Sequence, residues 1–218
     1  MNLKDYEYHR TDLGVLYLAD CLEIMPHLEP VDLVLTDPPY ANNTEYLSYT
    51  DTKENLKTIV GKLFPTIIDI AKRTLITCGV GNIFLYPEPT WILSWVTLAG
   101  TGCSSWGFSC WQPILAYGKC PYLSSGKGRR PDTFQLTRTS DKNEHPCPKP
   151  FGIMMQLIQR ASLYEGDSVL DPFLGSGTTA VACERLNRRW IGIEIEEKYC
   201  EIAAKRIEKE RSQLKLFR

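Results

Sequence analysis

The chain has 218 residues, of which 43% are hydrophobic and 23% are charged, and its formal net charge is -1. These values fit one globular domain across residues 1–218, and they exclude a disordered chain and a uniformly basic nucleic-acid coat. The sequence holds no apolar run of about 18 residues, and polar residues follow Met1 in place of a signal peptide. We therefore predict a cytoplasmic protein with no membrane contact.

The eight cysteines are scattered along the chain without a CxxC pair, and only three histidines accompany them. A disulfide framework or a zinc site needs closer and more regular spacing. We predict reduced cysteines and no metal site.

Two short apolar segments near the N-terminus, residues 15–19 and 31–36, are predicted as buried strands. An acid follows each of them, Asp20 after the first and Asp37 after the second. Apolar residues at helical spacing then predict a helix over residues 51–72, with Asp51 as its N-cap and a kink at Pro65. A further strand is predicted over residues 74–78.

The middle of the chain predicts a short aromatic helix over residues 87–102 and one or two strands over residues 106–117. Residues 119–144 are rich in glycine, serine and basic side chains, which indicates an exposed inserted loop. Charge alone favours a solvated loop there, although contact with a partner is an alternative.

The last third alternates helix and strand. We predict a helix from Pro148 to Tyr164, a strand over residues 167–171, a helix over residues 178–186, a strand over residues 190–194 and a charged helix over residues 196–211. This alternation is typical of a parallel sheet with helices on both faces, so the fold class is α/β.

A glycine-containing loop joins the strand that ends at Asp171 to the following helix, where free backbone amides and a close approach to a ligand are available. Glu194 closes the next strand, 19 residues after Gly175, near the spacing at which an acid binds ribose hydroxyls. The loop has no phosphate-gripping lysine. A cofactor with adenine and ribose but no phosphate is expected, and S-adenosylmethionine fits.

The second constellation is Asp37, Pro38, Pro39 and Tyr40, at the end of a predicted strand. The prolines fix the backbone and leave the Asp37 carboxylate and the Pro38 carbonyl as acceptors beside an aromatic ring. Two acceptors of this kind can hold the two hydrogens of a base amino group and direct its lone pair at a methyl donor. Tyr40 can stack on the base. A proline turn with an exposed acid is the alternative.

Together these motifs resemble the β class of DNA amino-methyltransferases, in which the catalytic motif comes first and the cofactor loop last. The resemblance covers nearly the whole chain and rests on residues 19–23, 31–40, 145–150 and 169–194. It implies a mostly parallel, doubly wound sheet of the Rossmann-like S-adenosylmethionine-dependent methyltransferase type, with a circularly permuted motif order.

The resemblance also implies residue roles. Asp20 would contact adenine, Glu194 ribose, and the glycine loop the methionine side, with the segment around Lys149 completing the pocket. The predicted cofactor residues are Asp20, Cys21, His145, Lys149, Pro150, Asp171, Phe173, Gly175, Ser176, Gly177, Thr178 and Glu194. Pro148 stands where the family commonly has glutamine, so only His145, Pro146, Lys149 and Pro150 of that segment carry over.

Duplex DNA hides its amino groups inside the stack, so such an enzyme must extrude the target base. With the motifs present, residues 119–144 are a candidate DNA-recognition element, and the predicted phosphate contacts are Lys127, Arg129, Arg130 and Arg138. This element is short for the family, so a homodimer or another partner could share the reading of the target.

Asp37 before the prolines favours N6 of adenine in DNA as the methylated atom, because in the family aspartate accompanies adenine more often and serine accompanies cytosine. N4 of cytosine is the runner-up. An RNA base methyltransferase and a non-catalytic DNA-binding relative stay open as further alternatives, and a cofactor-binding protein without nucleic acid is the weakest.

Overall fold

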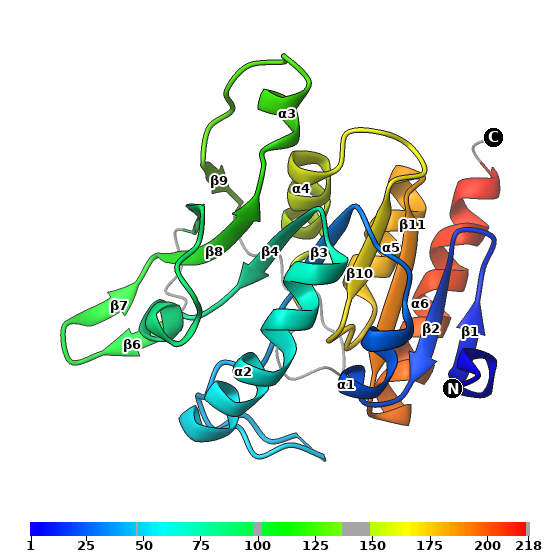
Figure 1. The fold of residues 1–218 in the computed structure, drawn as a ribbon, viewed down its shortest axis with the longest axis horizontal. Coiled ribbons are helices and arrows are strands. Elements are labelled where there is room, and N and C mark those ends of the chain that lie inside the picture. The colour runs from blue at the N-terminus through cyan, green and yellow to red at the C-terminus, as the bar shows by residue number, and fades with distance from the viewer. Residues whose placement is uncertain (47, 98–101, 137–148, 217–218) are drawn as a thin grey trace.

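The computed structural model describes residues 1–46, 48–97, 102–136 and 149–216, so Arg138 and His145 lie outside the described residues. Its main feature is a nine-stranded sheet in the order β1-β2-β11-β10-β3-β4-β8-β5-β9 (Figure 1). The strands are β1 (Glu7–Arg10), β2 (Gly14–Leu18), β3 (Leu33–Thr36), β4 (Arg73–Thr77), β5 (Trp91–Val96), β8 (Trp111–Gly118), β9 (Thr133–Gln135), β10 (Ser168–Asp171) and β11 (Arg189–Glu194).

The central strands β2, β11, β10, β3 and β4 are parallel to one another, while β1 and β8 run antiparallel to their neighbours β2 and β4. The prediction of an α/β fold with a mostly parallel sheet is therefore confirmed. From β10 the chain moves outward to β11, and from β3 it moves outward in the opposite direction to β4. The order reverses between β10 and β3, and open α/β sheets bind ligands at such a point.

Helices cover both faces of this sheet. They are α1 (Cys21–Ile24), α2 (Lys53–Ile70), α3 (Pro121–Ser124), α4 (Phe151–Ala161), α5 (Thr178–Leu186) and α6 (Glu197–Leu216), with short 3-10 turns at η1 (Leu3–Tyr6), η2 (Met25–His27) and η3 (Val80–Leu85). Leu33 and Leu35 of β3 pack against α4 and α5, whereas Val34 between them packs against α2. Alternate residues of a strand point to opposite faces, so each face of the sheet has its own apolar core.

The start of α2 differs from the prediction. Thr52 is the N-cap, and its hydroxyl accepts a hydrogen bond from the Asn55 amide. Asp51 is buried just before it, and its carboxylate accepts bonds from the backbone amides of Ala41, Asn42 and Thr44. Asp51 therefore folds the loop that follows Asp37, a role that a local capping pattern does not reveal.

The helix predicted over residues 87–102 is wrong, because the described part of that segment forms strand β5. Leu93 and Trp95 are buried and alternate with more exposed neighbours, and the whole strand pairs with β8. The described residues of the predicted inserted loop contain α3 and the edge strand β9, which pairs with β5. Non-local pairing decided both segments.

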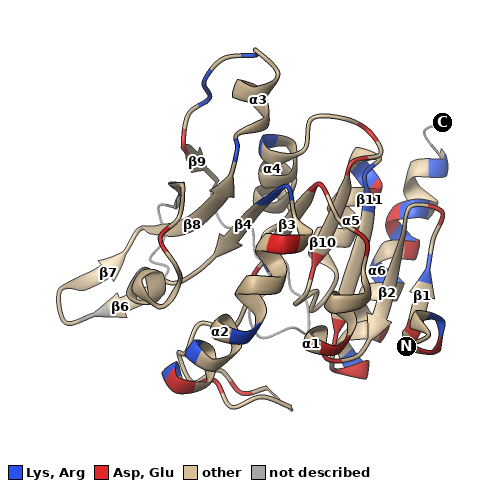
Figure 2. Ribbon diagram, in the orientation of Figure 1, with Lys and Arg blue, Asp and Glu red and all other residues tan. Residues whose placement is uncertain are grey.

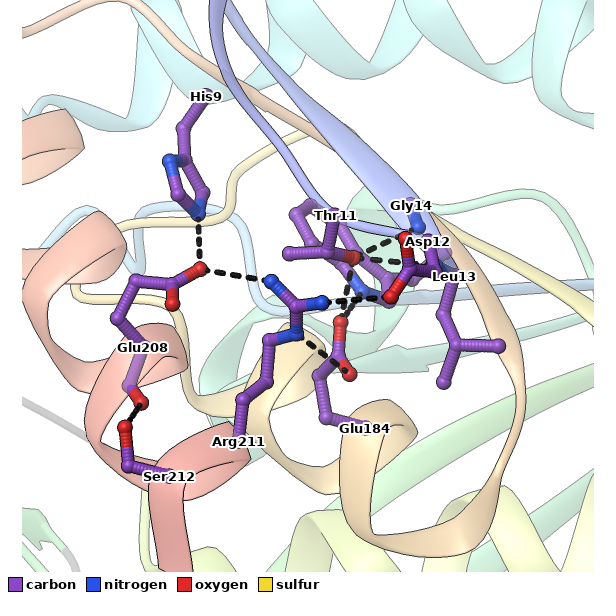
Figure 3. Close-up of polar contacts among 10 residues, drawn as sticks. His9, Thr11, Asp12, Leu13, Gly14, Glu184, Glu208, Arg211 and Ser212 are labelled. Carbon is purple, nitrogen blue, oxygen red and sulfur yellow. Dashed lines mark hydrogen bonds and ion pairs between the residues drawn. The ribbon is translucent and has the colours of Figure 1, made fainter. Parts of the chain in front are cut away.

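The N-terminal hairpin is tied to the C-terminal helix by a polar network (Figure 3). The buried Glu184 carboxylate accepts hydrogen bonds from Thr11 at 2.6 Å and from the Trp190 indole at 2.8 Å. Arg211 of α6 donates to Asp12 at 2.7 Å and pairs with Glu208. The first and last elements are thus fixed to each other. No helix among the described residues is long and apolar enough to cross a membrane.

Candidate functional site

A cavity of about 280 Å³ lies where β2, β3, β10 and β11 end, around the point where the strand order reverses. The residues that end or follow these strands line it, together with Asn42, Thr44, Tyr46, Ser48 and Tyr49 of the next loop and the start of α6. Of the predicted site residues, the cavity gathers Asp20, Cys21, Asp37, Pro38, Pro39, Tyr40, Lys149, Asp171, Phe173, Gly175, Ser176, Thr178 and Glu194.

The Asp37 side chain accepts three hydrogen bonds in this cavity. Its Oδ1 accepts hydrogen bonds from the Tyr40 hydroxyl at 2.7 Å and from the Thr77 hydroxyl, and its Oδ2 accepts one from Lys149 Nζ at 2.7 Å. Burial raises the pKa of Tyr40 well above its ordinary value, so this phenol stays protonated and donates. The carboxylate is consequently held in one orientation by three different segments of the chain.

Lys149 makes a contact that the sequence did not predict. Its side chain is 6% exposed, its ammonium group forms an ion pair with Asp37, and it lies 4.5 Å from the centroid of the Tyr40 ring. Lys149 also lines the cavity, and its predicted cofactor contact stays a prediction. It reaches Asp37 from 112 residues further along the sequence.

The loop after Tyr40 is fixed from outside as well. The Asn82 side-chain amide donates to the Tyr40 carbonyl at 2.6 Å, and both the amide and hydroxyl of Ser48 donate to Glu196 Oε1. Ser48 thereby links the loop to the segment that follows Glu194. The side of the cavity that contains Asp37 and the side that contains Glu194 are therefore connected through Ser48.

Asp171 lies beside Asp37 at the end of the adjacent strand and is fully enclosed. Burial raises its pKa to about 7, although hydrogen bonds from Thr179, the Phe173 amide and Thr36 oppose that rise. The two neighbouring carboxyl groups therefore differ. Asp37 has an ammonium partner, whereas the hydrogen bonds described for Asp171 come only from neutral donors.

The predicted ribose-binding acid, Glu194, closes β11 at the rim of the cavity. Its Oε2 accepts a bond from the Gly175 amide at 2.8 Å, and its Oε1 accepts bonds from the amides of Ile195 and Glu196. Burial raises its pKa, while these backbone donors lower it. Asp20 caps α1 through the Leu22 amide and lines the cavity from the other side.

The charges of the lining can be compared with the expected cofactor. Five acids line the cavity, namely Asp20, Asp37, Asp171, Glu194 and Glu196, and Lys149 is the single base among the described lining residues. Such a set repels phosphate and attracts hydroxyl donors and positive charge. The residues present fit a phosphate-free, cationic adenosine derivative. Among the described residues, no group of three or more His, Cys, Asp or Glu is arranged to hold a metal ion.

For three predicted cofactor residues, the structure shows a packing or protonation property that bears on their predicted role. Gly177 is the N-cap of α5 with φ +83°, and a Cβ there would lie 2.8 Å from Ala203 Cβ, so glycine is needed for packing on α6. Pro150 is buried at the N-cap of α4 and lies outside the cavity lining. Cys21 lines the cavity, but burial raises the pKa of its thiol to about 12, so it stays protonated.

The predicted DNA contacts that the structure describes are not brought to the catalytic loop. Arg129 and Arg130 line a second cavity, of about 830 Å³, together with Arg73 and Gly118. Arg73 begins β4 and pairs with Gly118 at the end of β8, so this cavity lies at the opposite end of the sheet from Asp37. Figure 2 shows basic segments along the loop between α3 and β9. Lys127 lies 5.5 Å from the Tyr164 ring. A DNA contact of these residues stays a prediction.

Sequence reasoning missed several residues that shape the site. Thr77 ends β4, which pairs with β3, and its hydroxyl donates to Asp37. The only signal for this contact in the sequence is a polar residue at the end of an apolar strand. Asn82 and Ser48 lie in loops and carry no motif. Their partners are separated from them by 42 and 148 residues, so no local pattern could indicate them.

The fold and cavity define a class, namely an α/β protein with an acid-rich pocket at the point where the strand order reverses, whose lining fits a phosphate-free nucleoside cofactor. The comparisons specify it further. The sequence model of the family described as DNA methylase matches residues 87–205, and the chain belongs to this family.

Individual relatives agree with that membership. The chain is 49% identical over 80 residues to the type II methyltransferase M2.DpnII of Streptococcus pneumoniae, which covers 36% of this chain and 30% of that protein. It is 27% identical to the type II methyltransferase M.BamHI of Bacillus amyloliquefaciens, across 99% of this chain and 61% of that protein. The chain thus spans less than two thirds of the length of either relative.

A solved structure is similar throughout. The crystal structure of the M1.HpyAVI–SAM complex matches 88% of this chain and 99% of that chain, with a TM-score of 0.64 and 26% sequence identity. The permuted, mostly parallel sheet is therefore a fold shared with known DNA methyltransferases.

Proposed function

We propose that this protein transfers the methyl group of S-adenosylmethionine to an exocyclic amino nitrogen of a base in DNA, with N6 of adenine as the target. One observation carries the proposal. The acceptor carboxylate of Asp37 and the ribose-type acid Glu194 line the same cavity, at the point where the strand order reverses.

The cofactor half supports the proposal through its chemistry. Glu194, held by the Gly175 amide, and Asp20, held by the Leu22 amide, are fixed acceptors for hydroxyl and amino donors. Bound S-adenosylmethionine would supply a methyl group on a positively charged sulfur, and an acid-rich lining suits that charge. The similar M1.HpyAVI structure is a complex with this cofactor.

The catalytic half supports an amino-group substrate. Asp37 Oδ1 is occupied by two hydroxyl donors, and Oδ2 faces Lys149, so the carboxylate is oriented before any base arrives. An amino group can donate one hydrogen to Asp37 and the other to the Pro38 carbonyl. This arrangement directs the nitrogen lone pair away from the ring and lowers the barrier to methyl transfer by positioning.

Lys149 acts in this scheme as a positioning residue. Its ammonium group fixes Oδ2 and lies 4.5 Å from the centroid of the Tyr40 ring. Tyr40 lines the cavity, where its ring can stack with a base. The base reaches this position by extrusion from the duplex.

The test is to incubate the protein with unmethylated plasmid DNA and labelled S-adenosylmethionine, and then to separate the nucleosides. Label in N6-methyl-2′-deoxyadenosine is expected. Label only in N4-methyl-2′-deoxycytidine contradicts the adenine assignment but retains the mechanism, because both bases present an exocyclic amino group. Preferential labelling of RNA in a parallel reaction contradicts the DNA assignment. An absence of label in every reaction points to a non-catalytic relative.

A further inference from the structure

Two aromatic side chains at the catalytic end of the molecule are almost fully exposed. Phe84 is 94% exposed and Trp106 is 99% exposed, the highest values among the large apolar side chains that the structure describes. Exposing so much apolar surface is unfavourable unless a partner covers it. Both residues belong to segments that leave the sheet on the side of the catalytic cavity.

Phe84 lies on a segment attached directly to the catalytic loop. The turn η3 follows β4, and its buried Asn82 donates to the Tyr40 carbonyl at 2.6 Å. Ile83 and Leu85 pack on the core that contains Leu56 and Ile76, whereas Phe84 between them points outward. The packed side chains of η3 thus hold the exposed Phe84 ring in place, two residues after Asn82, which contacts the loop of Tyr40.

Trp106 is presented by a narrow two-stranded ribbon, β6 (Gly102–Ser104) and β7 (Gly107–Ser109), and lies in the turn between its strands. Along the chain, the ribbon follows β5 and precedes β8. The pair at its base, Val96 of β5 with Trp111 of β8, lies beyond Thr77–Ile114, which is the last pair between β4 and β8. The ribbon therefore extends past the catalytic end of the sheet (Figure 1). Phe108 on β7 is 68% exposed.

We infer that Phe84 is an aromatic wedge that enters the base stack of duplex DNA beside the extruded target base, and that Trp106 contacts the same duplex further along. The inference rests on the proposed function. A base that enters the cavity leaves a gap in the duplex, and an aromatic ring compensates for the lost stacking. The occupant is DNA because the chain belongs to a DNA methylase family and both exposed rings lie on segments that leave the sheet at the end where Asp37 lies.

Exposed lysines at the same end match this occupant. Lys53 and Lys57 lie on the first turns of α2, which begins at the catalytic end, and both are exposed. Cations at this position can neutralise phosphates flanking the target, without any contribution from the basic residues at the other end of the sheet.

The experiment compares two duplexes that carry the methylation site identified by sequencing methylated plasmid. In one the target base is paired, and in the other it faces an abasic site, where extrusion costs less. Phe84→Ala is expected to lower methylation of the paired duplex roughly tenfold or more and to retain most activity on the abasic-opposed duplex. Phe84→Trp is expected to restore the paired reaction. Trp106→Ala is expected to raise KM for both duplexes with kcat unchanged.

Trp91→Ala is the matched control, because Trp91 is 60% exposed but lies at the opposite end of β5, beside the second cavity. It should leave methylation of both duplexes unchanged. Equal loss on both duplexes for Phe84→Ala would overturn the wedge, since it would indicate damage to the catalytic loop. Unchanged methylation of the paired duplex by Phe84→Ala would also overturn the wedge. A change of oligomeric state in Phe84→Ala or Trp106→Ala would overturn it as well, because the exposed rings would then contact a second copy of the chain.

A binding measurement separates this inference from the proposed function. With 2-aminopurine at the target position, the wild-type protein should increase the fluorescence of the duplex on base extrusion, and Phe84→Ala should not. Extrusion without methyl transfer by the wild-type chain contradicts the proposed reaction but supports the wedge. Equal fluorescence changes for both proteins contradict the wedge but leave the reaction intact.

Discussion

At the carboxyl ends of β2, β3, β10 and β11 the smaller cavity is lined by five acids and one ammonium group, whereas the larger cavity at the opposite end of the sheet is lined by Arg73, Arg129, Arg130 and Arg160. The basic cavity has the charge that DNA would attract, yet the acidic one has the strand ends, the glycine loop and the ordered carboxylate. The position of the basic residues in the sequence therefore does not predict where the site lies in this fold. The direction of the parallel strands does, because such sheets bind their ligands at the carboxyl ends of the strands.

The strongest way to test this comparison is to remove one acid from each end. Asp37→Asn should lower methylation roughly a hundredfold to a thousandfold, because the carboxylate that orients the amino group is lost while its size is kept. Asp132→Asn, at the basic end, removes the charge of the residue that accepts a hydrogen bond from the Trp91 indole and should leave methylation unchanged. Initial rates with labelled cofactor measure both. Equal losses for the two variants would contradict the placement of the reaction at Asp37.

A somewhat smaller loss is expected for Lys149→Met. Asp37 then keeps its hydroxyl donors but loses the ion pair, so kcat should fall about tenfold to a hundredfold with little change in KM for the cofactor. The free energy of unfolding should fall by about 3 kcal/mol, since a charge in a largely buried pair is left alone.

Lys149→Arg should recover part of the activity, whereas Lys127→Met at the basic end should change neither quantity. An increase in cofactor KM with unchanged kcat would return Lys149 to the predicted cofactor role.

The pH dependence of stability reports the protonation state of Asp171. The folded-state pKa of Asp171 is raised to about 7, so its protonated form stabilises the native state fully below the unfolded-state pKa near 4, and this contribution disappears as the pH rises through 7. The difference in unfolding free energy between wild type and Asp171→Asn should change by at most about 1.4 kcal/mol per pH unit between pH 5 and 7. Urea denaturation at several pH values measures it, and a constant difference would show that Asp171 is ionised throughout.

The smallest effect is expected from the double substitution of Arg129 and Arg130 by alanine. Both residues lie at the end away from Asp37, and Arg130 already covers the Tyr122 ring at 4.8 Å. Duplex methylation should change less than about twofold, and the slope of log affinity against log salt should stay the same. A slope smaller by about two would instead support the predicted phosphate contacts.

The sequence predicted the parts of this molecule whose cause is local. The strands that end at Asp37 and Asp171, the helix Thr178–Leu186 and the acid Glu194 all follow from short apolar patterns and a glycine loop. The strand Trp91–Val96 was missed, because its identity depends on pairing with β8 rather than on its own residues. The same limit applies to Lys149, whose contact with Asp37 is made by the folding of distant segments.

The strand order also has a consequence for the folding of the chain during its synthesis. β3, which carries the catalytic loop, lies between β4 and β10, and β2 lies between β1 and β11. The two strands that separate β2 from β3 are the last two of the chain, so both inner edges are unpaired until residues 168–194 have left the ribosome. Non-local parallel pairing of this kind is slow. A chain interrupted before residue 168 would expose two strand edges and would be prone to aggregate.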